Sequence, residues 1–405
     1  MNSITAKDIG ILRDLAKRQM EYAMTPENQR RNDAWYKHND LQGEKPLVTI
    51  EEQTFMQELS RPLSCESKKG QHFEGQILLN IICREDIDDD RATPDYFAVS
   101  DNCWFLPFGC EIDVNRMSDS IGFSFVHPVS DLVQDWDKIG KSKWGFENSD
   151  DFDVAHEVFS GIMPIRRISD YPVVSLTQHL VKLMGMEALY LSMYDHPDLL
   201  IKLMSRLTDD FISFYTEMEH TGRLITNNKN QAVAQGTYGQ TNALSYRENA
   251  SLKDMWGYAD SQETVSISPD QFDEFFFPYY KKIMDLCGLV NYGCCEPVHR
   301  IWDRCLSKCG NLRKLSISPW CDEEFIGDKL RDTNVIYHRK PSPNLVSAFG
   351  SFDEVSYARE ITTTLKAAKG CKLEFSLRDI YSLNGEKDRA KKVVRLIHSL
   401  IDRYW

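Results

Sequence analysis

Residues 289–405 alternate four times between a short apolar run and an amphipathic helical pattern. The four predicted pairs are Leu289–Cys294 with Glu296–Lys308, Leu312–Ser318 with Asp322–Leu330, Asn334–Arg339 with Phe352–Ala368, and Lys372–Leu377 with Glu386–Arg403. Repeated strand–helix units of this length indicate a parallel sheet, because right-handed crossovers return each strand to the same sheet. We therefore expect an α/β protein, a TIM-type (β/α)8 barrel with an N-terminal helical extension and loop insertions. A doubly wound open sheet is the alternative, but no G-x-G-x-x-G motif follows any of these strands.

The remaining chain predicts further helices and a loop-rich insertion. Residues 1–45 predict a helical extension of two helices, Ala6–Ala23 and one that starts at Thr25 with Pro26 in its first turn. Residues 46–405 are predicted to form one barrel domain, whose first strand falls in Lys45–Ile50. Residues 84–143 are irregular and rich in acidic and aromatic side chains, so short strands and loops are expected there.

The middle of the chain predicts a strand followed by three helices. The strand is at 172–176, and the helices are Thr177–Leu191, the segment from Pro197 to Gly222, and the segment from Ser268 to Leu286. Between the second and third helices, the polar loop 236–246 is long enough to face a substrate.

Composition excludes several function classes. The chain has 405 residues and a formal net charge of −13, which argues against nucleic acid or an anionic membrane as the main partner. The sequence contains neither a continuous apolar signal-peptide core nor a membrane-spanning run, so a cytoplasmic protein is expected. Its eleven cysteines are scattered and mostly lie in apolar segments, where a buried thiol is the ordinary interpretation.

Reactive side chains gather just after the predicted strands, where barrel enzymes keep their active sites. Glu263 and Asp379 are candidate catalytic carboxylates, each acting as general base or hydrogen-bond acceptor, and Cys295 is a candidate catalytic thiol. The predicted substrate-binding residues are Tyr238, Trp256, Gln262, Tyr292, Trp320 and Lys340. Pairing of Glu263 and Asp379 with neighbouring cations, and burial of the aromatic residues in the core, are the structural alternatives.

Cys294, Cys295 and Glu263 form a candidate zinc site. Thiolates and a carboxylate are zinc ligands, and a catalytic zinc takes three protein ligands and keeps one open position. Adjacent side chains of an extended segment point to opposite faces, so we expect only one of the two thiols to face the cavity. The spacing is not that of a C-x-x-C pair, and thiols that simply pack or contact substrate are the alternative. His299 is interpreted as a surface or capping residue.

Several motifs resemble the uroporphyrinogen decarboxylase-like superfamily, in particular its long bacterial branch related to cobamide-dependent methyltransferases. The motifs are YDHPDLLIKLMSRLTDDF, SQETVSISPDQFDEFFFPYYKKIMDLCGL, YGCCEPVHRIWD, NLRKLSISPWCD and GCKLEFSLRDIYS, and the resemblance runs from about residue 176 to the C-terminus. It implies a TIM barrel with the site at the carboxyl ends of its strands. It also implies one of two activities, porphyrinogen decarboxylation or zinc-assisted methyl transfer to a corrinoid protein.

The resemblance leads to one principal hypothesis, a methyltransferase or O-demethylase that moves a methyl group from a small methylated substrate to a corrinoid (cobamide) carried by a partner protein. An aryl methyl ether and a methylamine are the candidate substrates. Zinc is the candidate metal, and a homodimer is one candidate assembly. The sequence has Tyr292 where thiol-directed relatives have the histidine of H-x-C.

Two other functions are kept as alternatives. One is a decarboxylase of a tetrapyrrole or other polycarboxylate, although the sequence lacks the R-Q-A-G-R segment of true decarboxylases. The other is a non-catalytic barrel that binds a corrinoid or tetrapyrrole.

Overall fold

The protein is built on a seven-stranded parallel sheet. The computed structural model describes residues 4–116, 123–347 and 350–405. The strands are β1 (Leu47–Ile50), β8 (Val173–Val174), β9 (Trp256–Ala259), β10 (Leu289–Tyr292), β11 (Leu312–Ile317), β12 (Ile336–Arg339) and β13 (Leu373–Leu377). Their order in the sheet is β1-β13-β12-β11-β10-β9-β8, and every neighbouring pair is parallel. The predicted parallel α/β architecture is therefore confirmed.

The sheet has two edges, and a closed (β/α)8 barrel is not detected. Within the described residues no strand joins β8 to β1. The predicted strand around residue 173 is only two residues long, and the apolar run at 232–237 forms a single isolated bridge, between Ala232 and Tyr238. The arrangement is consistent with a TIM-like barrel.

Polar residues on one face of the sheet hold the loop that follows the second long helix. Thr49 Oγ1 donates to Gly236 O at 2.7 Å, and Asn291 Nδ2 donates to Val233 O at 3.2 Å. Lys314 Nζ reaches Thr237 Oγ1 at 2.6 Å. The loop thus supplies carbonyls and a hydroxyl that pair with Thr49, Asn291 and Lys314 on this buried face. The loop brings Gln235 to the carboxyl ends of the strands.

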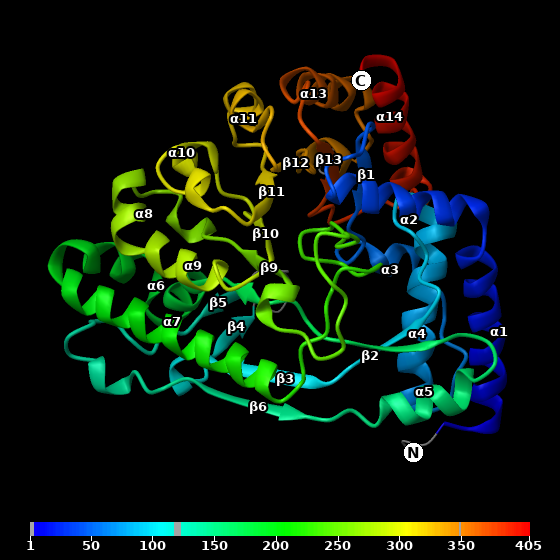
Figure 1. Cartoon of the computed structure of the whole chain (residues 1–405), viewed down its shortest axis with the longest axis horizontal. Helices are drawn as coiled ribbons and strands as arrows, with labels where there is room; N and C mark the ends of the chain where they lie inside the picture. The colour runs from blue at the N-terminus through cyan, green and yellow to red at the C-terminus, as the bar shows by residue number, and fades with distance from the viewer. Residues whose placement is uncertain (1–3, 117–122, 348–349) are drawn as a thin grey trace.

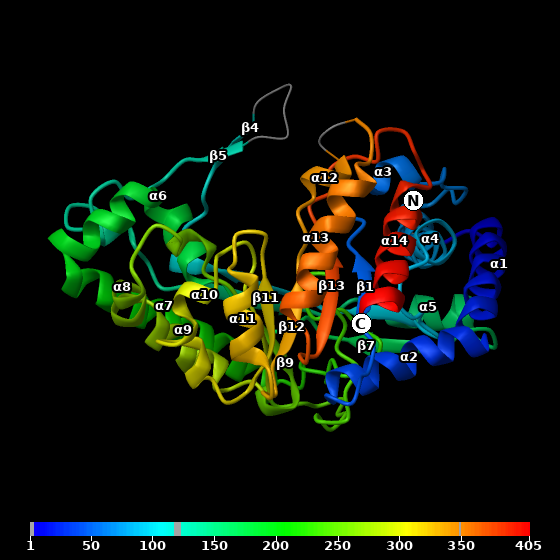
Figure 2. The same cartoon turned by 90° about the horizontal axis from the view of Figure 1, so that it is seen from above.

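The helices of the predicted strand–helix pairs cover the outside of the sheet (Figures 1 and 2). They are α10 (His299–Trp302), α11 (Glu323–Leu330), α13 (Glu354–Ala367) and α14 (Arg389–Tyr404), and a short helix that was not predicted, α12 (Asn344–Ser347), precedes α13. α14 buries Val393, Val394, Ile397 and Ile401, the helical spacing of one apolar face. The helix predicted over Glu296–Lys308 is shorter than expected: it consists of α10 and a 3-10 turn at Leu306–Lys308.

Two other predicted helices are interrupted. The helix expected from Ser268 to Leu286 is split into α8 (Pro269–Phe275) and α9 (Phe277–Met284), because Pro278 lacks an N–H and its ring would clash with a carbonyl one turn earlier. α6 (Leu176–Asp195) changes direction at Gly185, whose φ of 80° is outside the helical region. α7 (Pro197–His220) is continuous, as predicted.

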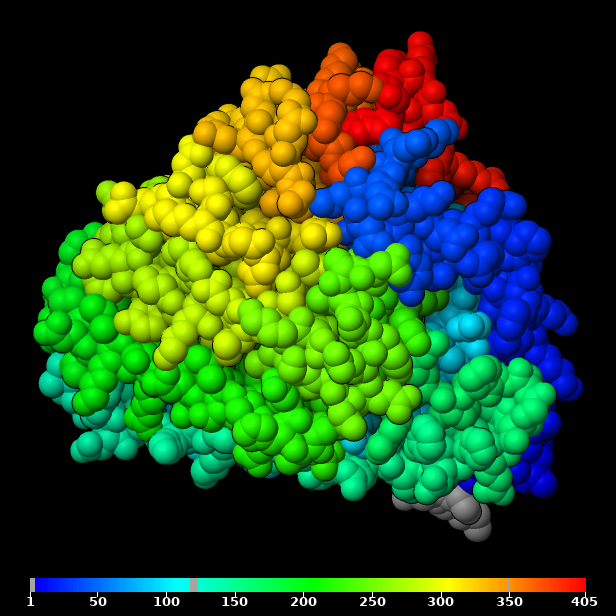
Figure 3. Space-filling view, viewed as in Figure 1, coloured from blue at the N-terminus to red at the C-terminus, as the bar shows by residue number. Residues whose placement is uncertain are grey.

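The N-terminal helices form as predicted. α1 (Ala6–Ala23) and α2 (Pro26–Asn39) begin at the caps Thr5 and Thr25. α1 packs with α4 (Lys68–Ile82) and α5 (Asp151–Phe159) in a second apolar core. α2 instead contacts the polar loop, since Asn39 Nδ2 donates to Tyr238 O at 2.9 Å. Figure 3 shows the chain after α7 (green to lime) in contact with this N-terminal part (blue). The predicted domain boundary at residue 45 stays a prediction.

The predicted irregular segment 84–143 consists of short strands, loops and a turn of π-helix, Cys83–Ile87, with residues 117–122 outside the described part. The strands form three small sheets with β6 (Lys143–Glu147) and β7 (Ile165–Ile168): β2 (Phe97–Ser100) with β7, β3 (Asn102–Leu106) with β6, and β4 (Val114–Arg116) with β5 (Phe123–Phe125). Figure 2 shows the β4–β5 hairpin projecting away from the rest of the molecule.

The short helix α3 (Met56–Leu59) follows β1. Among the described helices none has the length and apolar character that crossing a membrane requires.

Candidate active site

The two adjacent thiols lie together at the carboxyl end of β10. The Sγ atoms of Cys294 and Cys295 are 3.6 Å apart; Cys294 is partly buried and Cys295 is exposed. Of the two, Cys295 lines the open cavity beside them and Cys294 does not, in line with the expectation that one thiol faces it, and the chain turns at Gly293 (φ 105°). A Cβ at Gly293 would lie 3.0 Å from Ser316 Cβ, so the turn requires glycine.

Two cations from neighbouring strands stand beside Cys294. Lys340, after β12, donates to the carbonyls of Gly293 and Cys294, both at 3.3 Å. Arg378, after β13, has Nη1 3.9 Å from Cys294 Sγ and donates from Nε to Glu51 at 2.8 Å. Both cations also bond Gln235 Oε1. The predicted residue Lys340 is thus at the site, and Arg378 joins it.

These contacts make Cys294 a thiolate at neutral pH. The hydrogen bond from Cys295, followed by the charges of Lys340 and Arg378, outweighs burial and lowers the pKa of Cys294 to about 6. The same pairing raises the pKa of Cys295 above its ordinary value. A thiolate is the form of cysteine that attacks carbon and binds metals.

Glu296 is a buried carboxylate that holds the turn. Its two oxygens accept the backbone N–H groups of Ser261 at 3.0 Å and Cys294 at 2.8 Å. Burial, and then the negative charge of Asp260, raise its pKa to about 7. Glu296 therefore joins the loop after β9 to the thiol turn, and it changes charge near neutral pH.

Glu263 lies on an open cavity next to Cys295. The cavity has a volume of about 600 Å³ and is lined by Met186, Gln262, Glu263, Val265, Cys295, Pro297 and Trp320. Glu263 Oε2 accepts the Thr177 hydroxyl at 2.8 Å, and burial raises the pKa of this carboxyl. Trp320 is 71% exposed at the rim. Four residues predicted from the sequence, Glu263, Gln262, Cys295 and Trp320, are thus brought together.

Three predicted aromatic residues do not line this cavity. Trp256 is fully buried at the opposite end of β9, where its Nε1 donates to Gly239 O at 2.9 Å. Tyr238 lines another cavity with Arg91 and packs on Trp35 at 5.5 Å. Tyr292 is also fully buried, and its hydroxyl lies 2.6 Å from Ser261 Oγ. Tyr292 supports the loop after β9, and we remove Trp256 and Tyr238 from the candidate site.

Asp379 is near the thiols. It is partly buried, has a φ of 57°, and follows Arg378 directly. Its charge is one of the smaller contributions that raise the pKa of Cys295. Its predicted catalytic role stays a prediction.

Sequence reasoning missed three residues of the site. Glu51 and Asp260 follow β1 and β9 directly, as the predicted residue Lys340 follows β12, so the same rule could have found them. Gln235 comes from the loop that crosses the sheet, and its Nε2 donates to the Tyr258 hydroxyl at 2.8 Å. No local pattern in the sequence distinguishes Gln235.

The predicted metal ligands fit a zinc ion only in part. Zinc–sulfur bonds of about 2.3 Å in a tetrahedral site place two sulfurs roughly 3.8 Å apart, close to the spacing of Cys294 and Cys295. In the described part of the chain, however, no three His, Cys, Asp or Glu side chains are grouped as a metal site. Zinc stays a prediction.

Comparisons with known proteins leave the family open. No family model matches the chain, and neither does any curated protein. Among solved structures, a methyltransferase from Methanosarcina mazei is similar with a TM-score of 0.48 and 14% sequence identity, over 92% of this chain and 98% of that one. A likeness at this level identifies neither a family nor an activity.

Proposed function

We propose that this protein is a methyltransferase that demethylates a small methylated substrate, with an aryl methyl ether as the preferred class and a corrinoid protein as the methyl acceptor. The observation that supports the proposal best is the position of Glu263, a carboxyl whose pKa is raised by burial, on the same open cavity as Cys295 and Trp320. The motif resemblance supports the same reaction class.

Glu263 is suited to act as the general acid. A partly buried carboxyl whose pKa is raised can donate its proton to the ether oxygen as the bond from that oxygen to the methyl carbon breaks. The products are then a phenol, which carries the proton of Glu263, and a methyl group on the acceptor. A cobamide on the partner protein would supply the nucleophile that takes the methyl group.

The other residues of the cavity bind and orient the substrate. Trp320 and the apolar side chains of Met186 and Val265 offer an aryl group a surface to pack on. Of the two thiols Cys295 lines the cavity, and the Cys294 thiolate, whose Sγ lies 3.6 Å from that of Cys295, would place a negative charge near the bound substrate. A methylamine is the other candidate substrate.

The test is methyl transfer with matched variants. Purified protein is incubated with cob(I)alamin and a panel of aryl methyl ethers and methylamines, and methylcobalamin and demethylated product are measured. We expect Glu263→Gln to lower kcat for an ether about 100-fold, since it retains shape but not the acid. Glu274→Gln, at an exposed carboxylate of α8, is the control and should stay within twofold of wild type. Absence of transfer from every donor, or equal activity of the two variants, would reject the proposal.

The decarboxylase is the second candidate, because Lys340 and Arg378 could hold a substrate carboxylate. Arg378 is already paired with Glu51, which weakens this case. Incubation of the protein alone with a porphyrinogen, followed by chromatography, separates the two reactions. A third candidate is a non-catalytic barrel. It predicts that alanine at Glu263, Cys295 and Asp379 leaves ligand affinity nearly unchanged, and that the wild-type protein has no turnover.

A further inference from the structure

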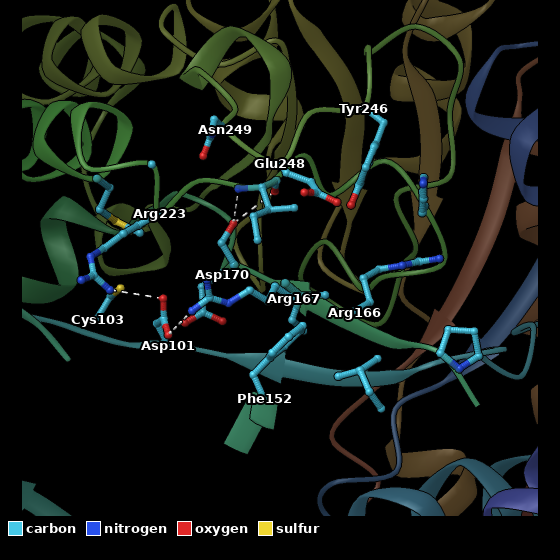
Figure 4. A pocket seen from close by; sticks show the side chains of 18 residues that line it. Asp101, Cys103, Phe152, Arg166, Arg167, Asp170, Arg223, Tyr246, Glu248 and Asn249 are labelled. Atoms are coloured by element: carbon cyan, nitrogen blue, oxygen red, sulfur yellow. Dashed lines mark hydrogen bonds and ion pairs between the residues drawn. The ribbon is translucent and has the colours of Figure 1, made fainter. Parts of the chain in front are cut away.

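A second cavity lies away from the thiols, between β7, the end of α7 and residues 246–249. Its volume is about 430 Å³, which falls in the range of small-molecule sites. Its lining residues come from five parts of the chain, and none of them lines the cavity beside Cys295. Figure 4 shows Arg166 and Tyr246 on one side of it and Asp101 with Arg223 on the other.

Cations on one side of the cavity, Arg223 and Arg167, form ion pairs with Asp101. Asp101 accepts from Arg223 at 3.2 Å and from Arg167 at 3.3 Å, and Arg223 also donates to Asn148 at 2.9 Å. These contacts fix the Arg223 side of the wall. That side therefore needs no ligand to hold its arginines in place.

Arg166 and Lys229 are different, because neither has an ion-pair partner in the described part of the chain. Each is held by a tyrosine ring instead: the Arg166 guanidinium lies 3.8 Å from the centre of the Tyr96 ring, and Lys229 Nζ lies 3.5 Å from that of Tyr246. Burial and the charge of Arg166 lower the pKa of Lys229, and the smaller contributions of the Asp95 and Glu248 charges raise it. The rings orient the cations without neutralising them.

The rest of the lining is a mixture of apolar and acidic groups. Phe152, Ile165 and Ile168 come from α5 and β7, and Met218 comes from α7. The carboxylates besides Asp101 are Asp170 and Glu248, both exposed. A ligand that suits the cavity thus has an anionic group and an apolar part.

We propose that this cavity binds a small organic phosphate, with the phosphate between Arg166 and Lys229 and the apolar part against Phe152 and Tyr246. Two cations without a direct ion pair in the described part of the chain match the double charge of a phosphate monoester better than the single charge of a carboxylate. The guanidinium of Arg166 can give a phosphate two parallel hydrogen bonds, and Lys229 adds a second point charge. The site is independent of the proposed methyl transfer.

The experiment measures binding of phenyl phosphate to the full-length protein by calorimetry at constant ionic strength. We expect saturable binding, weaker binding of inorganic phosphate and benzoate, and none of phenol. Arg166→Gln and Lys229→Gln should each weaken binding about tenfold or more, the usual effect of losing one charge-assisted contact. Arg247→Gln is the matched control, because Arg247 is exposed, adjacent in sequence to the lining, and paired with Asp254. It should bind within twofold of wild type.

Two further variants distinguish loss of the phosphate site from misfolding and from an effect of the thiol site. Arg166→Lys retains the charge and should recover part of the affinity, which a misfolded protein would not do. Cys294→Ala should bind phenyl phosphate as wild type does, because it alters the other site. No saturable binding to wild type, equal binding by Arg166→Gln and Arg247→Gln, or loss of binding in Cys294→Ala would each overturn the proposal. Failure of methyl transfer would leave it unaffected.

Discussion

Cys294 Sγ lies 3.6 Å from Cys295 Sγ and 3.9 Å from Arg378 Nη1. The first contact supplies a hydrogen bond and the second a positive charge, and both favour the thiolate of Cys294. The arrangement depends on a turn that only glycine allows at residue 293.

Alkylation of Cys294 should follow a pKa of about 6. Because its pKa is lowered, the thiolate forms as pH rises through about 6, well below the ordinary value of 9.0. The rate of iodoacetamide labelling at Cys294, measured by peptide mass spectrometry from pH 5 to 9, should reach half its maximum near pH 6. Cys321, whose pKa is raised by burial, is the internal control and should react slowly throughout. A midpoint for Cys294 near 9 would contradict the arrangement.

Cys295→Ala should raise the pKa of Cys294, since the hydrogen bond from Cys295 is the largest contribution that lowers it. We expect the midpoint of the labelling profile to move up by about one unit. Cys295→Ser keeps a donor and should remain closer to wild type. If alanine and serine have the same effect, Cys295 does not act through this hydrogen bond.

Gly293→Ala should disturb both fold and site. The residue has a φ of 105°, and an added Cβ would meet Ser316 Cβ at 3.0 Å. We expect a loss of about 1–3 kcal/mol in the free energy of unfolding, measured with urea, and a higher pKa for Cys294. Gly310→Ala is the control, because no atom lies within 4 Å of its Cβ position. A Gly293 variant as stable as the Gly310 variant would show that the turn is not strained.

The buried pair Lys314–Glu374 should be costly to break. The Lys314 Nζ to Glu374 Oε2 distance is 3.0 Å, and both side chains are fully buried. Lys314→Met removes the lysine from a buried carboxylate that keeps only His38, at 3.1 Å, and His338, at 3.6 Å, beside it, so we expect a loss of about 3–5 kcal/mol in urea unfolding. Lys45→Met removes one partner of the exposed pair Lys45–Asp402 and should cost less than about 1 kcal/mol. Similar losses in the two variants would contradict the burial of the pair.

Stability should fall as the pH drops below 6.5. Burial lowers the pKa of His179 and of His338 to about 3, so the unfolded chain takes up these protons first. Their contribution is complete above pH 6.5 and is lost as the pH falls toward 3, at about 1.4 kcal/mol per pH unit for each histidine. Urea midpoints at pH 7.5, 6 and 5 measure the slope. His338→Gln should reduce it, whereas replacement of the exposed His72 should not.

Local signals in the sequence predicted most elements correctly. Thr25 followed by Pro26 marked the start of α2, and alternating apolar runs marked β10 to β13, because caps and periodicity depend on neighbours within one or two turns. The same patterns predicted one continuous helix through Phe276, where α8 and α9 are separated. Pro278 is the residue in the sequence that indicated a break there.

The sequence by itself determined the parallel α/β class and the rule that reactive residues follow the strands, which placed Lys340, Glu263 and Cys295 at the site. Only the tertiary structure decided that Trp256 and Tyr238 lie elsewhere, that Gln235 joins Lys340 to Arg378, and that both thiols meet. The physical reason is range: secondary structure follows from contacts a few residues apart, whereas the contacts of Gln235 with Lys340 and Arg378 join residues more than 100 positions apart through packing of the whole chain.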